Sequence, residues 1–352
     1  MPHAPTEIAG RDLESARFQQ EIAQRCRPVV IRGLVADWPV VAAARGSPRA
    51  LRDYLAAFDA GARTEVFLGD SAIRGKYYYN PGLNGFNFER RTMKLMDAVD
   101  CILEALDHPE ARSVYVGSVP TADCLPGFAA GNPMPLLPCG GGPRIWLGTA
   151  ANISSHYDTF DNLACVVAGQ RRFTLYAPEL IGRLYVGPLD NTMSGPPVSL
   201  AASAPDPGDR AASEGTPSGG DKQFPLFEEI RDQALQAQLE PGDALYLPKL
   251  WWHQVESIAP LNGLVNYWWD GFSAGPDAPY TALLLSMIAI SERPAAERQA
   301  WRAFFDHYVF RTSGHPLAHL PPEHHGLLGP LKSDNYSKIR ARIMRMLRGA
   351  VG

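Results

Sequence analysis

Short apolar runs separated by turn residues fill the middle of the chain, and this pattern predicts a β-rich fold. From Arg144 onward, segments with strand character are bounded by Gly, Pro, Asn and Asp, which are typical turn residues. The expected strands are RIWLGTA, ACVVAG, RRFTLYAP, ALYLP, QVESI and LVNYWWD. Many short strands at such spacing are typical of a β-barrel or jelly roll.

The flanking segments have mixed or helical patterns. Before this region we expect helices at 11–26, 47–58 and 92–106, and strands at 29–31, in TEVFLG and in SVYVGSV. After Asp270, helical spacing is found in YTALLLSMIAI, AAERQAWRAFFDHYVF and SKIRARIMRMLRG. The chain therefore divides into an N-terminal α/β part at 1–140, a β core at 141–272 and C-terminal helices at 273–352.

Composition is that of an ordinary globular protein with many turns. The 352 residues are 45% hydrophobic and 20% charged, and they include 32 Gly and 31 Pro, which favours a turn-rich β architecture. A net charge of -4 argues against an extended nucleic-acid surface. Residues 194–225 are poor in large apolar side chains, so we expect 201–222 to be a largely disordered loop in the absence of substrate.

The cysteines and the chain ends favour a cytoplasmic protein. The five cysteines are widely spaced and include no C-x-x-C pair, which is typical of reduced thiols. The N-terminal segment has no apolar signal core, and YTALLLSMIAI is only about half the length of a membrane span.

Candidate metal ligands lie in the stretch SSHYDTFDN. In a β-strand, His156 and Asp158 would project from the same face while Tyr157 points the other way. Two such side chains make half a metal site, although an isolated H-x-D is also common at strand ends. A possible third ligand is His253, in LEPGDALYLPKLWWHQVESI, which completes a triad if the two runs are neighbouring strands. Read alone, His253 is more typical of a packed core histidine than of a metal ligand.

Taken together, these stretches resemble a known family. In order along the chain, the matching segments are HYDTFDNLACVVAGQRRFTLYAP, LYVGP, FPLF, LEPGDALYLPKLWWHQVES and LVNYWW. The chain is similar to the cupin-like JmjC hydroxylases, the group that includes factor inhibiting HIF and bacterial relatives. This resemblance implies a mainly β fold, a double-stranded β-helix with α-helical elaborations, and Fe(II) held by His156, Asp158 and His253. It also implies 2-oxoglutarate as co-substrate and O₂ as oxidant.

The resemblance also assigns a co-substrate cation. Relatives place a lysine at the position that is Arg171 here, and a guanidinium can pair with a carboxylate bidentately. Alternation supports the assignment, since Arg171, Phe173 and Leu175 share one strand face while Arg172 lies on the other. The alternative is a pair of solvent-facing arginines on a hairpin.

Further residues match family positions around the iron and co-substrate. Asn162 and Asn266 are expected to donate or accept hydrogen bonds there, with strand-end capping as the alternative. The position of the usual hydroxylated residue is Ile153, so Ser154 is the candidate if the alignment shifts by one. From the N-terminal part, Tyr79 is our choice among Tyr77, Tyr78 and Tyr79, all of which are also compatible with core packing.

The function that follows from this resemblance is Fe(II)- and 2-oxoglutarate-dependent hydroxylation of an unactivated C–H group. The substrate is a side chain of a protein or peptide, or a small molecule. Removal of an N-methyl group by the same chemistry, or a catalytically silent cupin that acts as a binding or sensor module, are the alternatives. The C-terminal helices carry much apolar surface, and relatives dimerise through this region, so we expect a homodimer.

Overall fold

The computed structural model divides the chain into two compact units, Met1–Trp269 and Asp270–Gly352. It describes residues 3–108, 112–137, 141–189, 192, 195, 197–203, 224–271, 277–331 and 334–349. Most of the segment predicted to be a loop at 201–222 lies outside the described residues. The predicted parts 1–140 and 141–272 share one sheet, because β6 pairs with β7 across their boundary.

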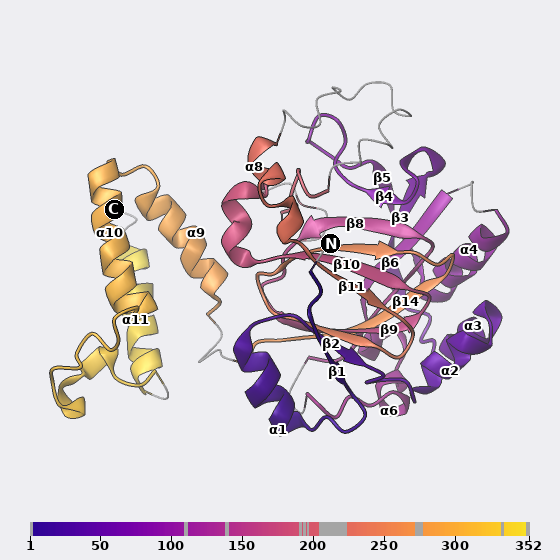
Figure 1. Ribbon diagram of the computed structural model, residues 1–352, viewed down its shortest axis with the longest axis horizontal. Helices are drawn as coiled ribbons and strands as arrows, with labels where there is room; N and C mark the ends of the chain where they lie inside the picture. The colour runs from indigo at the N-terminus through magenta and orange to yellow at the C-terminus, as the bar shows by residue number, and fades with distance from the viewer. Residues whose placement is uncertain are drawn as a thin grey trace. The chain divides into compact units, whose positions relative to one another are not determined.

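Two β-sheets form the first unit (Figure 1). The nine strands of the large sheet are, in spatial order, β1 (Thr6–Ala9), β2 (Val29–Arg32), β12 (Ala244–Leu247), β9 (Asp161–Ala168), β14 (Asn262–Trp269), β7 (Arg144–Gly148), β6 (Arg112–Pro120), β3 (Arg63–Asp70) and β5 (Phe88–Lys94). The five strands of the small sheet are β11 (Leu235–Leu239), β10 (Arg171–Tyr176), β13 (Trp252–Ser257), β8 (Ala151–His156) and β4 (Lys76–Tyr77). The fold is the jelly roll of a cupin-like domain, as the strand pattern predicts.

Alternation along each strand of the large sheet sorts side chains between two cores. On β9, Leu163 and Cys165 pack into the outer core, while Ala164 and Val166 pack into the core between the sheets. All eight residues of β9 are buried, because helices cover the outer face of the sheet and the small sheet covers the inner face. The apolar run that predicts this strand is therefore nearly continuous.

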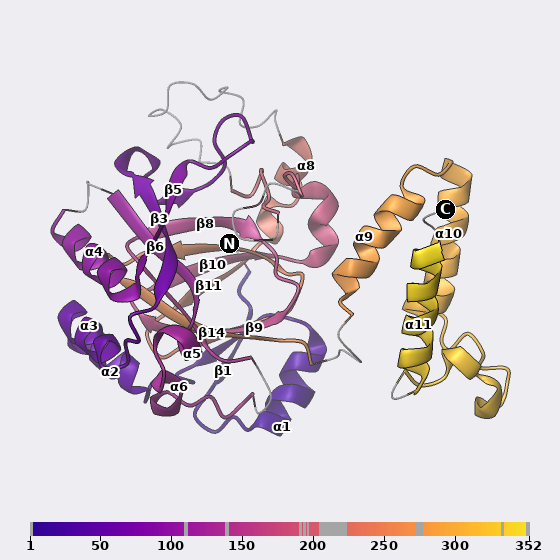
Figure 2. The same cartoon turned by 180° about the vertical axis from the view of Figure 1, so that it is seen from behind.

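Helices cover the outer face of the large sheet. They are α2 (Pro39–Gly46), α3 (Pro48–Ala56) and α4 (Leu95–Asp107), which lie together beside the sheet in Figure 2. The start of α3 is fixed by Ser47, whose hydroxyl accepts a hydrogen bond from the Ala50 backbone N–H, and by Pro48 at the first helical position. Leu51, Leu55 and Ile102 bury the inner faces of α3 and α4 in the outer core.

Short helical segments complete the first unit. They are α1 (Ser15–Arg17), η1 (Phe18–Ile22), η2 (Ala23–Arg25), η3 (Ser71–Ile73), α5 (Thr121–Cys124), α6 (Phe128–Gly131), η4 (Pro178–Arg183), α8 (Pro225–Glu228) and η6 (Arg231–Gln233). The helix predicted at 11–26 is thus a succession of α, π and 3₁₀ turns over 15–25. The helix predicted at 92–106 begins only at Leu95, because the preceding residues belong to β5, which pairs with β3.

The second unit is helical, as its sequence pattern predicts. Its segments are α9 (Pro279–Ile290), α10 (Ala295–Phe305), η7 (Asp306–Phe310), η8 (Pro322–His324), η9 (Gly326–Leu328) and α11 (Asp334–Gly349). Apolar side chains remain exposed on α9 and α11, among them Leu283, Ile288 and Met346. The homodimer stays a prediction, which the mass of the full-length protein in light scattering will check.

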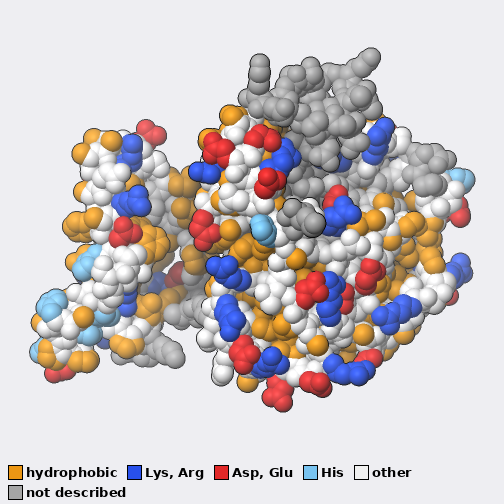
Figure 3. Space-filling view, viewed as in Figure 1, with side chains coloured by type: hydrophobic (Ala, Val, Ile, Leu, Met, Phe, Trp, Pro, Cys, Tyr) orange, Lys and Arg blue, Asp and Glu red, His pale blue; other side chains and the backbone are white. Residues whose placement is uncertain are grey.

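The surface of the first unit carries both signs of charge. On the face shown in Figure 3, Lys and Arg side chains are interspersed with Asp and Glu, in keeping with the small net charge of -4. In the described part of the chain, no helix is both long enough and apolar enough to cross a membrane.

The connection between β9 and β10 offers a test of the fold. Gly169 has φ +69, and a Cβ there would lie 2.3 Å from the Leu261 carbonyl oxygen. We expect Gly169→Ala to lower the free energy of unfolding by roughly 3 kcal/mol or more, because backbone strain and a clash with backbone combine. Gly33 has φ +68 and open space around it, so Gly33→Ala should cost only about 1–2 kcal/mol. Urea unfolding of both variants measures the difference, and equal losses would contradict the role given to the clash.

Candidate metal and co-substrate site

Two histidines from distant parts of the chain lie opposite each other on neighbouring strands. β8 and β13 run antiparallel, and His156 is paired in register with His253. The centroids of the two rings are 4.3 Å apart. The condition set by the sequence, that the two runs be neighbouring strands, is met.

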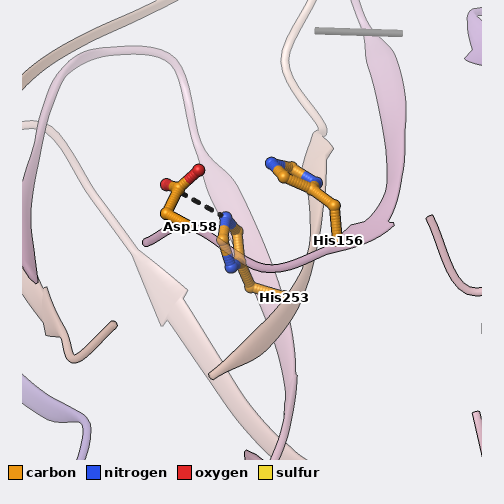
Figure 4. Close-up of side chains that lie close together, drawn as sticks. All are labelled: His156, Asp158 and His253. Carbon is orange, nitrogen blue, oxygen red and sulfur yellow. Dashed lines mark ion pairs between the residues drawn. The ribbon is translucent and has the colours of Figure 1, made fainter. Parts of the chain in front are cut away.

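Asp158 joins the two histidines from the loop after β8. Its nearest side-chain oxygen, Oδ2, lies 3.8 Å from Nε2 of His253. Figure 4 shows the three side chains directed toward one another. One ligand atom from each residue lies within 4.8 Å of the other two, a separation that one metal ion can bridge.

The position of Asp158 differs from the sequence expectation in one respect. β8 ends at His156, so Asp158 does not share a strand with it. Instead, the Asp158 carbonyl accepts a hydrogen bond from the Leu250 backbone N–H at 2.8 Å. The indole Nε1–H of Trp268 donates to Asp158 Oδ2 at 3.2 Å. The loop is therefore held at both its backbone and its carboxylate.

Both histidines present the ring nitrogen that a metal requires. Nδ1 of His156 lies 2.8 Å from the Ser154 carbonyl oxygen, and Nδ1 of His253 lies 3.0 Å from that of Trp251. A carbonyl only accepts, so each Nδ1 carries the proton and each Nε2 keeps its lone pair. Burial, together with the neighbouring His156, lowers the pKa of His253 to about 4, so this ring is neutral near pH 7.

The ligand set is suited to an open metal centre. Across the described residues, no fourth His, Cys or carboxylate completes the group. Two imidazoles and one carboxylate on one side of an ion leave adjacent positions for exogenous ligands, which is the arrangement of non-haem Fe(II) oxygenases. A structural zinc site, by contrast, is closed by four protein ligands.

A cavity of about 590 Å³ between the two sheets contains this group. Its walls include apolar side chains from both sheets, among them Ile153, Phe173, Leu247, Val255 and Leu264. A volume of this size is typical of small-ligand sites.

Arg171 lines the same cavity as an unpaired buried cation. The residue is only 4% exposed, and within the described residues its Nε atom has no hydrogen-bond partner. Burial lowers the pKa of Arg171 to about 10, but the guanidinium still carries its charge at pH 7. As alternation predicts, Arg172 points away and pairs with Glu256 at 3.3 Å, with 42% of its side chain exposed. A buried cation without a counter-ion is costly, which favours an anionic ligand here.

Asn162 and Asn266 form an oriented amide pair in the cavity wall. The Trp146 indole N–H can only donate, and it donates to Asn266 Oδ1 at 2.6 Å. The Asn266 amide nitrogen consequently donates to Asn162 Oδ1 at 3.1 Å. This chain of hydrogen bonds leaves the Asn162 amide nitrogen as a donor that can serve a ligand.

The serine and the tyrosines predicted to contact the co-substrate have other partners in the structure. Ser154 donates to the Tyr77 carbonyl oxygen at 2.7 Å, so its hydroxyl is already used. Tyr77 lines the cavity, but its hydroxyl lies 3.1 Å from that of Ser113. Tyr78 and Tyr79 pack in a separate aromatic cluster and are not among the side chains that line the cavity. A contact of Ser154 or Tyr79 with the co-substrate stays a prediction.

Tyr115 is one of the cavity residues that sequence reasoning missed, together with Arg144, Trp146 and Trp268. It is buried, lines the cavity and has no hydrogen-bond partner for its hydroxyl within the described residues. Burial raises the pKa of Tyr115 to about 12, and the charges of Arg171 and Asp158 also act on it. The signal was the alternation in SVYVGSV, which puts Tyr115 and Gly117 on one face of β6.

Comparison with known proteins agrees with this geometry. A family model described as a cupin-like domain matches residues 15–275. The chain is 34% identical over 128 residues to Jumonji C domain-containing protein 5 of Drosophila melanogaster, which is 36% of this chain and 27% of that protein. It is 31% identical over 128 residues to lysine-specific demethylase JMJ31 of Arabidopsis thaliana, covering 36% and 20% of the two chains. It is 28% identical over 162 residues to human HSPB1-associated protein 1, covering 45% and 30%. The chain thus spans less than a third of each of these relatives.

Removal of a metal ligand is the direct test of this centre. We expect the protein to bind one Fe(II) per chain, and His156→Ala or Asp158→Ala to weaken binding by on the order of 100-fold or more, since one of three ligands is lost. Anaerobic titration calorimetry measures the affinity. His108→Ala, a histidine exposed at the end of α4, serves as the control and should bind like the wild type. Full affinity in either ligand variant would show that the metal is bound elsewhere.

Proposed function

The chain belongs to the cupin-like JmjC family, and on this premise we propose that it is an Fe(II)- and 2-oxoglutarate-dependent oxygenase. It hydroxylates an unactivated C–H group of a protein or peptide side chain, or of a small molecule. The observation that carries this proposal is the presence, in one cavity, of an open His-Asp-His group and a buried arginine to which the described part of the chain supplies no counter-ion.

The residues present fit both groups. His156, Asp158 and His253 would hold the iron, which with 2-oxoglutarate and O₂ supplies the oxidant that such enzymes use on C–H bonds. Arg171 binds the far carboxylate of 2-oxoglutarate through charge-assisted hydrogen bonds. The Tyr115 hydroxyl supplies a further donor from the large sheet. The apolar side chains around them exclude water, which strengthens each of these polar contacts.

Trp268 and the amide pair keep the site in one geometry before any ligand binds. Trp268 donates to Asp158 Oδ2, the oxygen nearest to His253 Nε2, and so holds the carboxylate beside the histidines. Trp146 fixes both asparagine amides, so the free donor of Asn162 has a defined orientation. Because these side chains need no rearrangement, the free-energy cost of ordering them is met during folding rather than during binding.

One assay separates an enzyme from a silent binding module. An oxygenase converts 2-oxoglutarate to succinate only when Fe(II) and O₂ are present, whereas a module that only binds ligands does not. Succinate that forms without iron, or no succinate under any condition, contradicts the proposal. N-methyl removal uses the same oxidant, and its product is recognised in mass spectrometry by the loss of a methyl group instead of the gain of one oxygen.

Arg171 provides the quantitative test of the co-substrate site. Arg171→Ala should weaken 2-oxoglutarate binding by about two orders of magnitude, the scale of a charge-assisted bidentate pair of roughly 3 kcal/mol. Arg171→Lys should recover part of the loss, since the charge returns with a single-point contact. Anaerobic titration of the Fe(II) protein, followed through the charge-transfer band, reports both affinities.

The control for this test lies one residue further along β10. Arg172→Ala removes an equally charged side chain whose partner is the outer residue Glu256, so 2-oxoglutarate binding should stay within about twofold of the wild type. Iron binding should survive in all three variants. A large loss for Arg172→Ala together with none for Arg171→Ala would contradict the assignment.

A further inference from the structure

A second arginine lines the cavity, on the wall formed by the large sheet. Arg144 is the first residue of β7, and its side chain is half-buried. Its Nε atom donates to the Ser118 hydroxyl and its NH2 group to the Ser118 carbonyl oxygen, both at 2.6 Å. Its guanidinium carbon lies 5.5 Å from the ring centroid of Trp268. The side chain is therefore held in one position by three contacts.

The residues that hold Arg144 form an irregularity in the sheet. The register of β6 against β7 shifts between Val116 and Val119, so Gly117 and Ser118 form a bulge that lines the cavity. Ser118 has φ +57, a left-handed conformation that is costly for a residue other than glycine. A Cβ on Gly117 would lie 3.0 Å from the Tyr115 ring and 3.3 Å from that of Trp146. Such bulges are over-represented beside active sites, where they redirect side chains.

Arg144 has no carboxylate partner among the residues that the structure describes. Among the other arginines in and near the cavity, Arg90 faces Glu65 at 3.9 Å and Arg172 faces Glu256, while Arg171 is assigned to the co-substrate under the proposed function. Burial lowers the pKa of Arg144, while the charge of Asp123 acts on it without an ion pair. A guanidinium has five N–H donors. Those of Arg144 that bond to Ser118 are on Nε and NH2, so the N–H groups of NH1 remain for a ligand.

Trp268 places this cation next to the reacting centre. One indole contacts Arg144 across its ring and donates through Nε1 to the metal ligand Asp158. Arg171, in contrast, belongs to the small sheet and is needed for the co-substrate under the proposed function. Each of the two sheets thus contributes an arginine to the cavity.

We propose that Arg144 binds a carboxylate of the substrate, so that the substrate is an acidic residue or another molecule with a carboxylate close to the carbon that is oxidised. This inference rests on the proposed function and adds the substrate class to it. A carboxylate can pair with the remaining guanidinium donors in the plane of the group, while the indole covers its face. The same wall disfavours a cationic side chain, because like charges would be brought together in a partly desolvated cavity.

The test uses the full-length protein loaded with Mn(II), which accepts the same kinds of ligand, and with 2-oxoglutarate. The probes are capped tripeptides of Ala-X-Ala with X as Asp, Glu, Asn, Gln or Lys, and an N-capped Ala-Ala-Ala with a free C-terminal carboxylate. Broadening of the probe's proton signals by protein-bound Mn(II) reports both affinity and closeness to the metal, without any turnover. The internal and the terminal acids distinguish an acidic side chain from a chain end as the source of the carboxylate.

We expect the Asp, Glu or free-terminus probes to bind at least about tenfold more tightly than the Asn and Gln probes. Arg144→Gln should abolish this preference, and Arg144→Lys should keep part of it because the charge remains. Arg90→Gln removes another cavity arginine, one that already faces a glutamate, and should leave the preference unchanged. Thermal unfolding of each variant verifies that it is folded.

Other results would overturn the inference. If the wild type shows no preference for acids, or prefers Lys, the substrate class is wrong. If Arg144→Gln is folded and keeps the full preference, Arg144 only holds the bulge and another group selects the substrate. A wild type that loads neither metal nor 2-oxoglutarate contradicts the proposed function and, with it, this inference. A loaded protein without acid preference contradicts the inference alone.

Discussion

The antiparallel pairing of β8 with β13 is the constraint on which the site depends. It brings His156 opposite His253, and a slip of one residue would turn one of the two rings away from the cavity. The pairing is irregular immediately after His253, where the register shifts before Val255. Such a shift bends a strand locally. It allows the two histidines to face each other while the residues from Val255 to Ser257 pair regularly with β8.

Hydrogen bonds between side chains fix the orientation of further polar groups in the cavity wall. Polar groups in the interior of a jelly roll must be paired, and here an indole fixes an amide, which fixes a second amide. Another indole, that of Trp268, fixes the carboxylate of Asp158. In the amide chain the indole determines the direction of the hydrogen bonds, because its N–H has no acceptor function. The donor that remains free at the end of the amide chain is the Asn162 amide nitrogen, which can serve a ligand.

Much of this arrangement could be predicted from the sequence, because it follows from period-two alternation. Alternation correctly distinguishes Arg171, which faces inward, from Arg172, which faces outward. A different pattern, a nearly continuous apolar run, predicts the buried central strand β9. The strand β11 was not expected: LQAQL alternates apolar and polar residues, but it is short, and Leu, Ala and Gln also favour helices. Its pairing with β10 makes it a strand.

The features that escaped prediction are those that depend on contacts between distant residues. Asp158 lies beyond its strand and is placed by Leu250 and Trp268, which no local pattern reveals. Tyr79 belongs to an aromatic stretch and Tyr115 is the single aromatic residue of SVYVGSV, but only Tyr115 lies on a strand that borders the cavity. The bulge at Ser118 has no signature in SVYVGSV beyond its glycine. Which side chain reaches a cavity depends on strand register, and register is decided by tertiary packing.

The two sheets make different contributions to the chemistry. Both histidines and Arg171 belong to the small sheet, so the metal and the co-substrate are held mainly by one structural element. Arg144, Trp268 and the asparagines belong to the large sheet, whose outer face is buried under helices. Trp268 contacts both Arg144 and Asp158, so it connects the arginine of the large sheet with the metal-ligand group. Changes on the large sheet can therefore alter what is bound beside the metal while the histidines keep their geometry, which is how one metal centre can serve different substrates within a family.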